Sequence, residues 1–266
     1  LRSNPQSAIM SPPALTGGRN PQLDVSAAWP MFHGSPGLLG RADGDLADSF
    51  TLRWKFKTGA EVKSSAAIQG GRLFIGSSDE NIYALDLSTG GKLWSHKTAG
   101  AVEAAPCVLD GRVVVGSTDG FLYALDAVTG DLKWKYETGG QILGAANWTP
   151  APDGRATWVL VGSYDNKLHC LEAQSGRLIW SVETDNYING APAVADGQCV
   201  FGGCDALIHV VSVADGVKVT QIDSGSYIAA SAAFHGGEIY VGNYGNVFLK
   251  DRKSTRLNSS HRLTSR

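Results

Sequence analysis

Two histidines are the side chains in this sequence best suited to bind a metal ion or to move a proton near neutral pH. His169 and His209 lie 40 residues apart, and an imidazole can serve as a ligand, a base or an acid. When the sequence is aligned to itself, both occupy the position that holds Tyr83 and Tyr123 elsewhere. An aromatic packing position is therefore favoured over a functional one for both rings.

The cysteines offer little chemistry. Cys107, Cys170, Cys199 and Cys204 lack the C-x-x-C spacing of a zinc site. Cys199 and Cys204 could approach each other across a strand and a turn, but their separation along the strand disfavours a disulfide. We expect them to be buried, small apolar side chains.

The sequence also lacks the common catalytic motifs. It contains no Gly-x-Ser-x-Gly, no Gly-x4-Gly-Lys-Ser/Thr and no His-Glu-x-x-His, which weakens hydrolase, nucleotide-binding and zinc-protease interpretations. Four aspartates recur at one place in the pattern, Asp79, Asp119, Asp165 and Asp205. Because an aspartate can accept the backbone N–H two residues on, we expect these to form turns rather than to catalyse.

The elements that position these residues come from a repeat of about 40 residues. The segment from Gly76 to Trp94 recurs from Gly116 to Trp134 and from Gly162 to Trp180. A weaker fourth copy begins at Gly202, and the repeat glycines are spaced 40, 46, 40 and 40 residues apart through Gly242. Repeats of this length built from short strands are typical of a β-propeller with four-stranded antiparallel blades.

Each copy reads as four strands. A small-residue strand such as Val102 to Val108 is followed by a two-residue turn, an apolar strand (Arg112 to Gly116), an alternating strand (Phe121 to Asp126) and an outer strand that carries Trp134. Small residues recur in the first strand at Ser65, Ala105, Ala145, Ala191 and Ser231. They favour a place nearest the propeller axis, where bulky side chains would collide.

The repeat resembles a known family. Ala84-x-Asp86-x-x-Thr89-Gly90-x-x-x-Trp94 is similar to the AxDxxTGxxxW tryptophan-docking motif of the pyrroloquinoline quinone (PQQ) type repeat. The second copy has the same motif at Ala124, Asp126, Thr129, Gly130 and Trp134. The third copy keeps Gly176 and Trp180. The segment from Trp29 to Gly40 is similar to one that often precedes the first blade in secreted members of the family.

Two branches of this family imply different functions. Quinoprotein dehydrogenases hold PQQ on the propeller axis with calcium, Glu, Asn and Asp side chains, a stacking Trp and a disulfide between adjacent cysteines. This chain has no adjacent cysteine pair, and its Asp and Asn residues map mainly to turns. The resemblance therefore favours the non-catalytic branch, with no catalytic residue, cofactor or metal. A fragment of a PQQ- and calcium-dependent alcohol or sugar dehydrogenase is the alternative.

The repeat also suggests boundaries. We expect a largely irregular N-terminal extension over residues 1–51, a propeller over 52–251 and a tail foreign to the repeat over 252–266, which carries five Lys or Arg and no acid. About five blades are visible, with a lone outer strand from Leu52 to Thr58. The resembling family usually has seven or eight blades, which implies that the ring is incomplete here; a five-bladed ring closed by an N-terminal strand is the alternative. In the last copy, Gly245 stands where the turn aspartate is expected.

Charge and hydropathy limit the classes of partner that this chain could bind. The 266 residues carry a net charge of -2, and without the tail the remainder is acidic, which argues against nucleic acid. No apolar run approaches the roughly 18 residues that span a bilayer. Trp148 and Trp158 flank the one insertion in the repeat and form a candidate contact loop, although Trp158 could simply begin the next strand. The resemblance to the PQQ-type repeat family implies a periplasmic or secreted scaffold that binds a protein partner, and these features agree with it.

Overall fold

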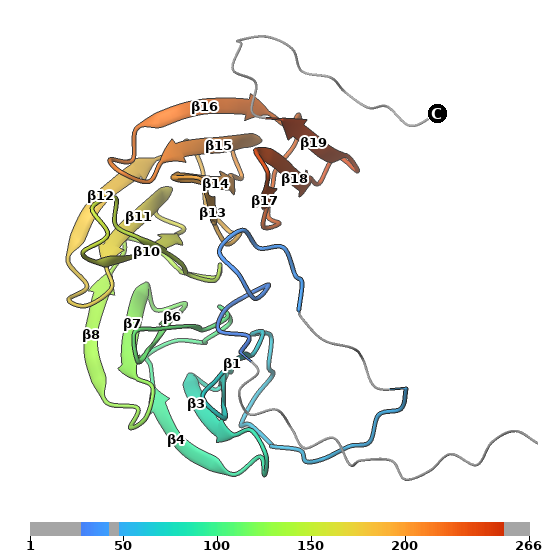
Figure 1. Ribbon diagram of the computed structural model, residues 1–266, viewed down its shortest axis with the longest axis vertical. Coiled ribbons are helices and arrows are strands. Elements are labelled where there is room, and N and C mark those ends of the chain that lie inside the picture. Colours follow the sequence, from blue (N-terminus) through green and yellow to red (C-terminus); the bar gives the residue numbers. More distant parts are fainter. Residues whose placement is uncertain (1–27, 43–47, 253–266) are drawn as a thin grey trace, which may run out of the picture.

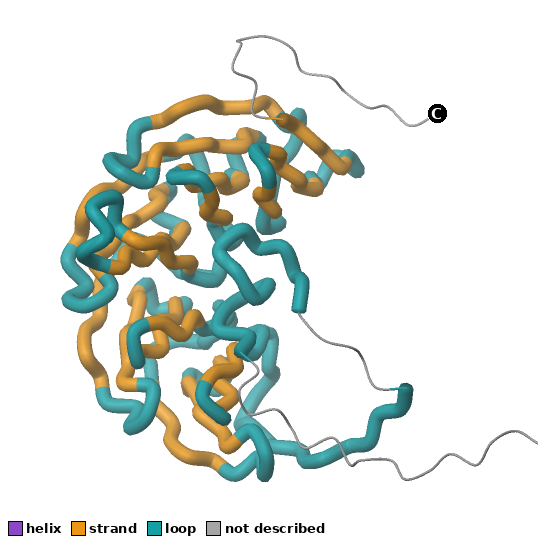
Figure 2. Tube along the Cα trace, viewed as in Figure 1, coloured by secondary structure: helices purple, strands orange, loops and turns teal. Residues whose placement is uncertain are grey.

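The computed structural model describes residues 28–42 and 48–252. Every regular element of these residues is a β-strand (Figure 2). The strands form five antiparallel sheets that follow one another along an open arc (Figure 1). We call each sheet a blade and number the blades in chain order. The all-β propeller architecture predicted from the repeat is confirmed.

Each blade runs from an inner strand to an outer strand in chain order. Blade 1 contains β1 (Ala67–Gln69), β2 (Arg72–Gly76), β3 (Asn81–Asp86) and β4 (Lys92–Lys97). Blade 2 contains β5 (Cys107–Leu109), β6 (Arg112–Gly116), β7 (Phe121–Asp126) and β8 (Leu132–Glu137). Blade 3 contains β9 (Asn147–Pro150), β10 (Thr157–Gly162), β11 (Lys167–Glu172) and β12 (Leu178–Glu183). Blade 4 contains β13 (Ala193–Ala195), β14 (Gln198–Gly202), β15 (Leu207–Ser212) and β16 (Lys218–Asp223). Blade 5 contains β17 (Ala233–His235), β18 (Glu238–Gly242) and β19 (Phe248–Arg252).

The first turn of a blade is the two-residue turn that the sequence predicts. Asp110 and Gly111 both have positive φ values, 46° and 71°, as a primed hairpin turn requires at its two central positions. Asp196 and Gly197 repeat this geometry in blade 4. These turns connect the innermost strand to the second strand and fix their register.

The second turn is capped by its aspartate. In blade 1, the backbone N–H of Asn81 donates to Asp79 Oδ1 (3.1 Å), and the N–H of Leu207 donates to Asp205 Oδ1 in the same way (3.1 Å). Blade 5 has Gly245 at this position and keeps the turn by another route. Asn243 Oδ1 accepts the N–H groups of Gly245 (3.0 Å) and Val247 (3.1 Å). An Asx side chain two residues earlier thus replaces the missing carboxylate.

Each tryptophan of the repeat docks on the following blade rather than on its own. Trp134 in β8 of blade 2 donates from Nε1 to the carbonyl of Ala173 in blade 3 (2.9 Å). Its ring lies so close to Gly176 that a Cβ on this glycine would be 2.6 Å from Trp134 Cδ2. Within one copy of the motif, the glycine therefore contacts the tryptophan of the preceding blade, and the tryptophan contacts the glycine of the following blade.

The innermost strands are shorter than predicted. A strand was expected from Val102 to Val108, but β5 spans only Cys107–Leu109. The residues before it cross from blade 1 to blade 2, and Val102 N donates to the carbonyl of Ser77 in blade 1 (3.0 Å). Because the Val102 amide bonds to the preceding blade, it cannot also join a ladder within its own blade.

The two ends of the arc differ from its middle. In the described residues blade 5 has three strands, and the predicted outer strand from Leu52 to Thr58 is extended without a ladder partner. The possibility of a five-bladed ring closed by an N-terminal strand is not realised in this part of the chain, because the arc stays open (Figure 1). Of the predicted tail, only Arg252 lies within the described residues, where it ends β19.

Candidate functional site

The inside of the arc is occupied by a segment of the same chain. Residues 28–42, called the axial segment below, run across the inner strands of successive blades (Figure 1). Trp29 and Ile68 of β1 exchange two backbone hydrogen bonds of 2.8 Å. The carbonyl of Pro30 accepts from Val108 N of β5 (2.6 Å). The N-terminal part of the segment thus bonds to blades 1 and 2.

The rest of the segment bonds to the other three blades. The carbonyl of Pro36 accepts from the Asn147 side chain of β9 (2.7 Å) and from Val194 N of β13 (2.7 Å). The carbonyl of Gly37 accepts from Phe234 N of β17 (2.9 Å). Fifteen residues therefore contact the innermost strand of all five described blades, and they act as a common inner wall.

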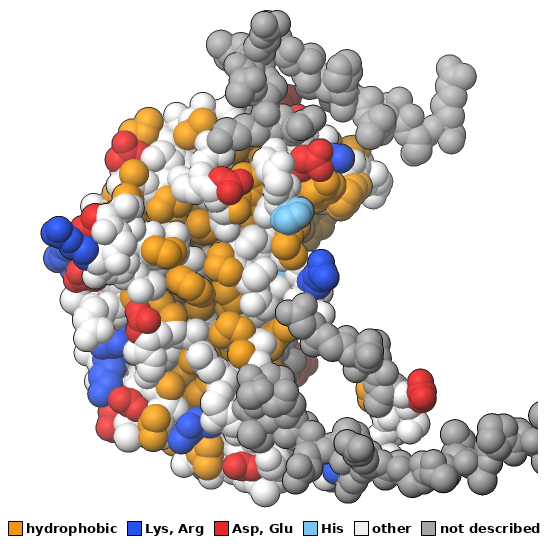
Figure 3. Space-filling model, viewed as in Figure 1, with side chains coloured by type: hydrophobic (Ala, Val, Ile, Leu, Met, Phe, Trp, Pro, Cys, Tyr) orange, Lys and Arg blue, Asp and Glu red, His pale blue; other side chains and the backbone are white. Residues whose placement is uncertain are grey.

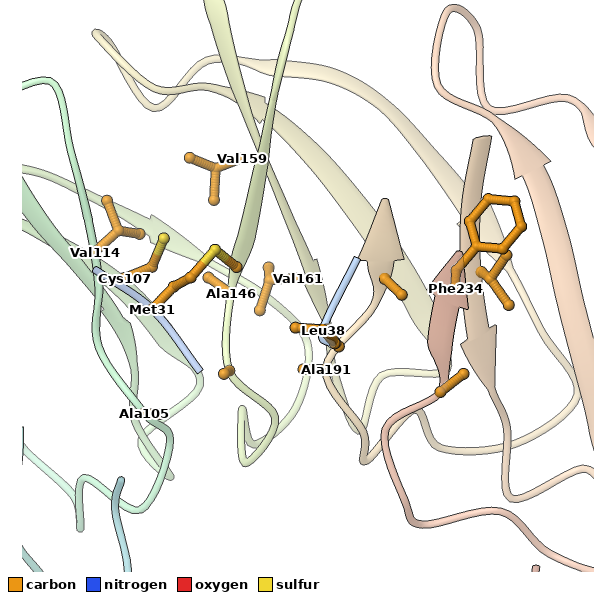
Figure 4. Packing of buried hydrophobic residues seen from close by; sticks show 14 of the residues in the cluster. Met31, Leu38, Ala105, Cys107, Val114, Ala146, Val159, Val161, Ala191 and Phe234 are labelled. Carbon is orange, nitrogen blue, oxygen red and sulfur yellow. The ribbon is translucent and has the colours of Figure 1, made fainter. Parts of the chain in front are cut away.

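Two apolar side chains of the axial segment enter the core. Met31 lies among Cys107, Val114 and Ala146, which belong to blades 2 and 3 or the loop between them (Figure 4). Leu38 lies beside Val161 and Ala191 (Figure 4). Met31 is fully buried and Leu38 is 2% exposed. The small residues predicted to line the axis leave the room that these two side chains fill.

Asn147 is a polar side chain that hydrogen-bonds to the axial segment. It is fully buried, and its Nδ2 donates to the carbonyls of Pro36 and Pro192, both at 2.7 Å. Its Oδ1 accepts from Trp148 N (2.6 Å). The corresponding positions of other blades hold small apolar residues, such as Ala67 and Cys107. Asn147 was not predicted to be a site residue, although a single amide at a position that otherwise holds small apolar residues was a visible signal in the sequence.

Each of the two histidines is hydrogen-bonded to the aspartate of its turn. His169 Nε2 lies 2.9 Å from Asp165 Oδ2, and His209 Nε2 lies 2.9 Å from Asp205 Oδ2. In blade 1 the Tyr83 hydroxyl donates to Asp79 Oδ2 in the same place (2.7 Å). The aromatic position predicted from the alignment is therefore also a hydrogen-bond donor to the turn.

The pKa values of these groups follow from burial and from the same bonds. Burial raises the pKa of Tyr83 to about 12, and the bond to Asp79 adds to this effect. Burial alone would raise the pKa of Asp165, but the hydrogen bonds from His169 and from backbone N–H groups outweigh it and hold the pKa at about 2. Burial lowers the pKa of His209 despite the neighbouring Asp205. The low pKa of Asp165 keeps its carboxylate charged at neutral pH, and the lowered pKa of His209 favours its neutral ring.

The remaining chemical groups are also tied into the fold. All four cysteines are free thiols, and burial raises the pKa of each, to about 12 for Cys107. In the motif, Asp86 Oδ1 accepts the N–H groups of Ser88 (3.1 Å) and Thr89 (2.8 Å). Within the described residues, no group of three or more His, Cys, Asp or Glu is placed to hold a metal ion.

Trp148 and Trp158 both lie in strands of the elongated inner hairpin. Trp148 belongs to β9 and packs against the core that surrounds the axial segment. Trp158 belongs to β10 and packs against the core between blades 3 and 4. Both indoles are half-buried, and residues 152–155 form the exposed tip of the hairpin. The structure brings the two tryptophans to one hairpin, and the tip extends beyond the two-residue turns of the other blades.

The surface carries charges of both signs. On the face shown in Figure 3, Lys and Arg side chains lie mainly around the outer edge, and hydrophobic side chains gather closer to the inside of the arc. The described residues include no helix with the length and apolar character needed to cross a membrane.

A PQQ and calcium site does not fit the residues found at the axis. The position nearest the axis is lined by small side chains and is filled by Met31, Leu38 and the backbone of the axial segment. The turn aspartates lie in turns, where they accept backbone N–H groups. The described part of the chain therefore offers neither the space nor the convergent carboxylates that such a group requires.

Comparisons with known proteins agree with this architecture. The family model described as outer membrane protein assembly factor BamB matches residues 47–154 and 142–266. The search of curated proteins gave no match. Among solved structures, the crystal structure of BamB from Moraxella catarrhalis is similar, with a TM-score of 0.65 and 19% identity over 76% of this chain and 61% of that one.

A designed protein shares the same architecture. The computationally designed Ika8 protein has a TM-score of 0.63 and 19% identity, over 70% of this chain and 57% of its own. This chain thus spans about three fifths of the length of the two structures, and at such identity the likeness concerns the fold alone. The two family matches together reach from residue 47 to residue 266. The chain therefore belongs to the family of the outer membrane protein assembly factor BamB.

Proposed function

We propose that this chain is a β-propeller scaffold of the cell envelope that binds a protein partner and has no catalysis of its own. Its family is described as an assembly factor for outer membrane proteins. The class of partner we propose is therefore a protein component of outer-membrane protein assembly. This function requires a rigid frame with projecting loops rather than a reactive centre.

The position of the axial segment is the observation that carries the proposal. Residues 28–42 bond to all five described blades and fill their inner side. In propellers that act on small molecules, the axis is a natural place for a ligand, because loops and inner strands converge there. Here that place is used for internal contacts, which leaves the exposed loops that connect the strands for binding.

The hairpin between β9 and β10 is the contact loop that we propose. Among the described blades it is the inner hairpin that is longer than its neighbours, and its tip at residues 152–155 is exposed. The half-buried indoles of Trp148 and Trp158 stiffen its base because both pack on the core. A stiff, projecting loop loses little entropy when it binds.

Site-specific photocrosslinking in a Gram-negative cell that exports the chain tests this function. A photoreactive phenylalanine derivative at Arg155 is expected to give a discrete crosslink to an envelope protein, identified by mass spectrometry. The matched control is the same residue at Gln69, which is exposed beside the short turn of blade 1. The absence of crosslinks at Arg155, or the same products at both positions, would overturn the contact loop.

A titration with PQQ and calcium tests the dehydrogenase alternative directly. The scaffold function predicts no stoichiometric binding of the quinone and no oxidation of alcohols or sugars with an artificial electron acceptor. Saturable binding with a shift in the quinone absorbance would contradict a purely structural axis and would restore the catalytic interpretation.

A further inference from the structure

Tyrosines gather on the loops at one end of the strands. Tyr164 lies in the turn between β10 and β11, Tyr187 in the loop from blade 3 to blade 4, and Tyr227 in the loop from blade 4 to blade 5. The rings of Tyr164 and Tyr187 stack, with centroids 4.6 Å apart and an angle of 4° between their planes. Tyr187 is 46% exposed and Tyr227 is 60% exposed. We call these three residues the tyrosine track.

A repeated backbone bond fixes the order of these side chains. Cys204 N donates to the carbonyl of Tyr187, and Tyr244 N donates to the carbonyl of Tyr227, both at 2.9 Å. Each loop between blades is thereby held against the second turn of the blade that follows. Because Tyr164 occupies the second turn of blade 3, the three tyrosines follow one another along the arc. A row of aromatic rings suits a linear ligand whose successive units can each pack on a ring.

The loops that carry the track contain no basic residue. No Lys, Arg or His occurs in the loops at this end of blades 3 and 4, which are residues 139–144, 163–166, 184–190, 203–206 and 224–230. The loops that lead into blades 1 and 2 differ, because they carry the ion pair between Lys63 and Glu103 (2.8 Å). A nucleic acid or an anionic lipid surface needs basic side chains to bind. The track therefore suits an uncharged ligand.

The isoleucines of the same loops are buried, whereas two tyrosines are exposed. Ile142, Ile188 and Ile228 are all fully buried. Polar amides accompany the exposed rings, and of these Gln141 is exposed and Asn189 is half-buried. A protein partner with an aliphatic face would find few matching side chains here. The surface instead combines aromatic faces with groups that both donate and accept hydrogen bonds.

A sugar ring matches this combination. The C–H bonds on one face of a pyranose carry partial positive charge, and the face of an aromatic ring is negative. The hydroxyl groups of the sugar need donors and acceptors, and an amide side chain supplies both. Asp185 adds an exposed carboxylate acceptor two residues before Tyr187. A glycan therefore uses the rings and the polar groups of these loops together.

We propose that the tyrosine track binds an uncharged glycan chain. Successive sugar rings stack on Tyr187 and Tyr227, and their hydroxyl groups bond to the side chains of Asn189 and Asp185. The track and the β9–β10 hairpin lie at opposite ends of the strands, because the first and second turns of a blade alternate between these ends. The glycan site is therefore separate from the contact loop proposed for a protein partner.

Isothermal titration calorimetry with the 266-residue chain tests the proposal. The probes are β-1,4-linked hexasaccharides of N-acetylglucosamine and of glucose, and we expect saturable binding of at least one, tighter than that of its disaccharide. Tyr187→Ala and Tyr227→Ala should each weaken binding by about tenfold. Tyr187→Phe, which keeps the ring, should bind within about twofold of the unmodified chain. The matched control is Phe50→Ala, an exposed aromatic residue outside the blades, which should also bind normally.

The variants also separate this site from the fold and from the contact loop. The unfolding midpoint of each variant shows that it is folded, and Tyr187→Ala should keep the crosslink from Arg155. Binding of neither hexasaccharide, or equal weakening by Phe50→Ala and Tyr187→Ala, would overturn the proposal. Binding of an uncharged peptide at the same tyrosines without binding of either glycan would also overturn it.

Discussion

At the residue scale, the histidines show how one position can keep a structural role while its chemistry changes. Tyr83 donates a hydroxyl hydrogen to Asp79, and His209 takes the equivalent position beside Asp205. The alignment predicted the aromatic packing but not the hydrogen bond, because the position of the turn carboxylate relative to the ring depends on the fold of the turn. The substitution introduces a group that titrates near neutral pH.

This difference predicts a pH dependence of stability. The pKa of His209 is lowered in the fold, mainly by burial, so the folded chain binds fewer protons there than the unfolded chain. The free energy of unfolding should therefore fall as the pH drops below about 6.5, the ordinary histidine pKa. His209→Tyr should make the denaturation midpoint fall less between about pH 7 and pH 5.

The readout is the pH-dependent change rather than the absolute stability, since the larger ring must also fit beside Phe201, which stacks on His209 at 4.9 Å. His235→Tyr, at an exposed histidine, is the control. A second fall in the free energy of unfolding is expected below about pH 3.8, where the unfolded chain protonates Asp165 but the folded chain, with a pKa of about 2, does not. This fall should persist in both variants. An unchanged slope in His209→Tyr would contradict the assignment.

Asn147 gives a second prediction at this scale. Its buried amide donates to the carbonyls of Pro36 and Pro192. Asn147→Ala removes both donors and leaves a small cavity, so we expect a loss of about 2 to 4 kcal/mol in the free energy of unfolding. Chemical denaturation measures this loss. A change of a few tenths of a kcal/mol would show that the two carbonyls do not depend on the side chain.

At the element scale, most of the blade could be predicted from sequence because its determinants are local and repeated. The primed turn at Asp110 and Gly111 and the cap at Asp79 each involve residues a few positions apart. The docking of Trp134 on Gly176 involves neighbouring blades, so the motif revealed both residues but not which copies touch. The inner strands were predicted too long because backbone bonds to the preceding blade leave no trace in the pattern.

The docking contact can be separated from backbone strain with two glycines. Gly176 and Gly154 have similar positive φ values, 72° and 69°, but only Gly176 faces an indole, and Gly154 has nothing within 4 Å. Gly154→Ala should cost about 1 kcal/mol of strain. Gly176→Ala should cost about 3 kcal/mol or more, because it also displaces Trp134. Equal losses of unfolding free energy in the two variants, measured with denaturant, would show that the contact between Trp134 and Gly176 does not add to stability.

At the scale of the whole molecule, the axial segment could not be predicted from periodicity. The sequence indicated that residues from Trp29 to Gly40 resemble a segment preceding the first blade, but its partners are distant in sequence. Pro36 accepts from Asn147, 111 residues away. No repeat pattern relates two such residues, and only the arrangement of the five inner strands along one arc brings them together.

Adjacent leucines test the role of this segment in stability. Leu38 is 2% exposed in the core, whereas Leu39 is 43% exposed. Leu38→Asp should lower the free energy of unfolding by about 3 kcal/mol or more, because it buries an unpaired carboxylate or forces the segment out. Leu39→Asp should change it by less than about 0.5 kcal/mol. Similar thermal denaturation of the two variants would show that the segment adds little to the fold.

We conclude that residues 28–42 fill the inside of the arc, and hydrogen exchange tests this conclusion. In the structure, the amides of Val108, Val194 and Phe234 donate to the carbonyls of Pro30, Pro36 and Gly37. We predict that these three amides are strongly protected in the unmodified chain and lose protection in Leu38→Asp, while Leu39→Asp leaves them protected. Rapid exchange of all three in the unmodified chain would contradict the claim and would leave the axis open to a ligand.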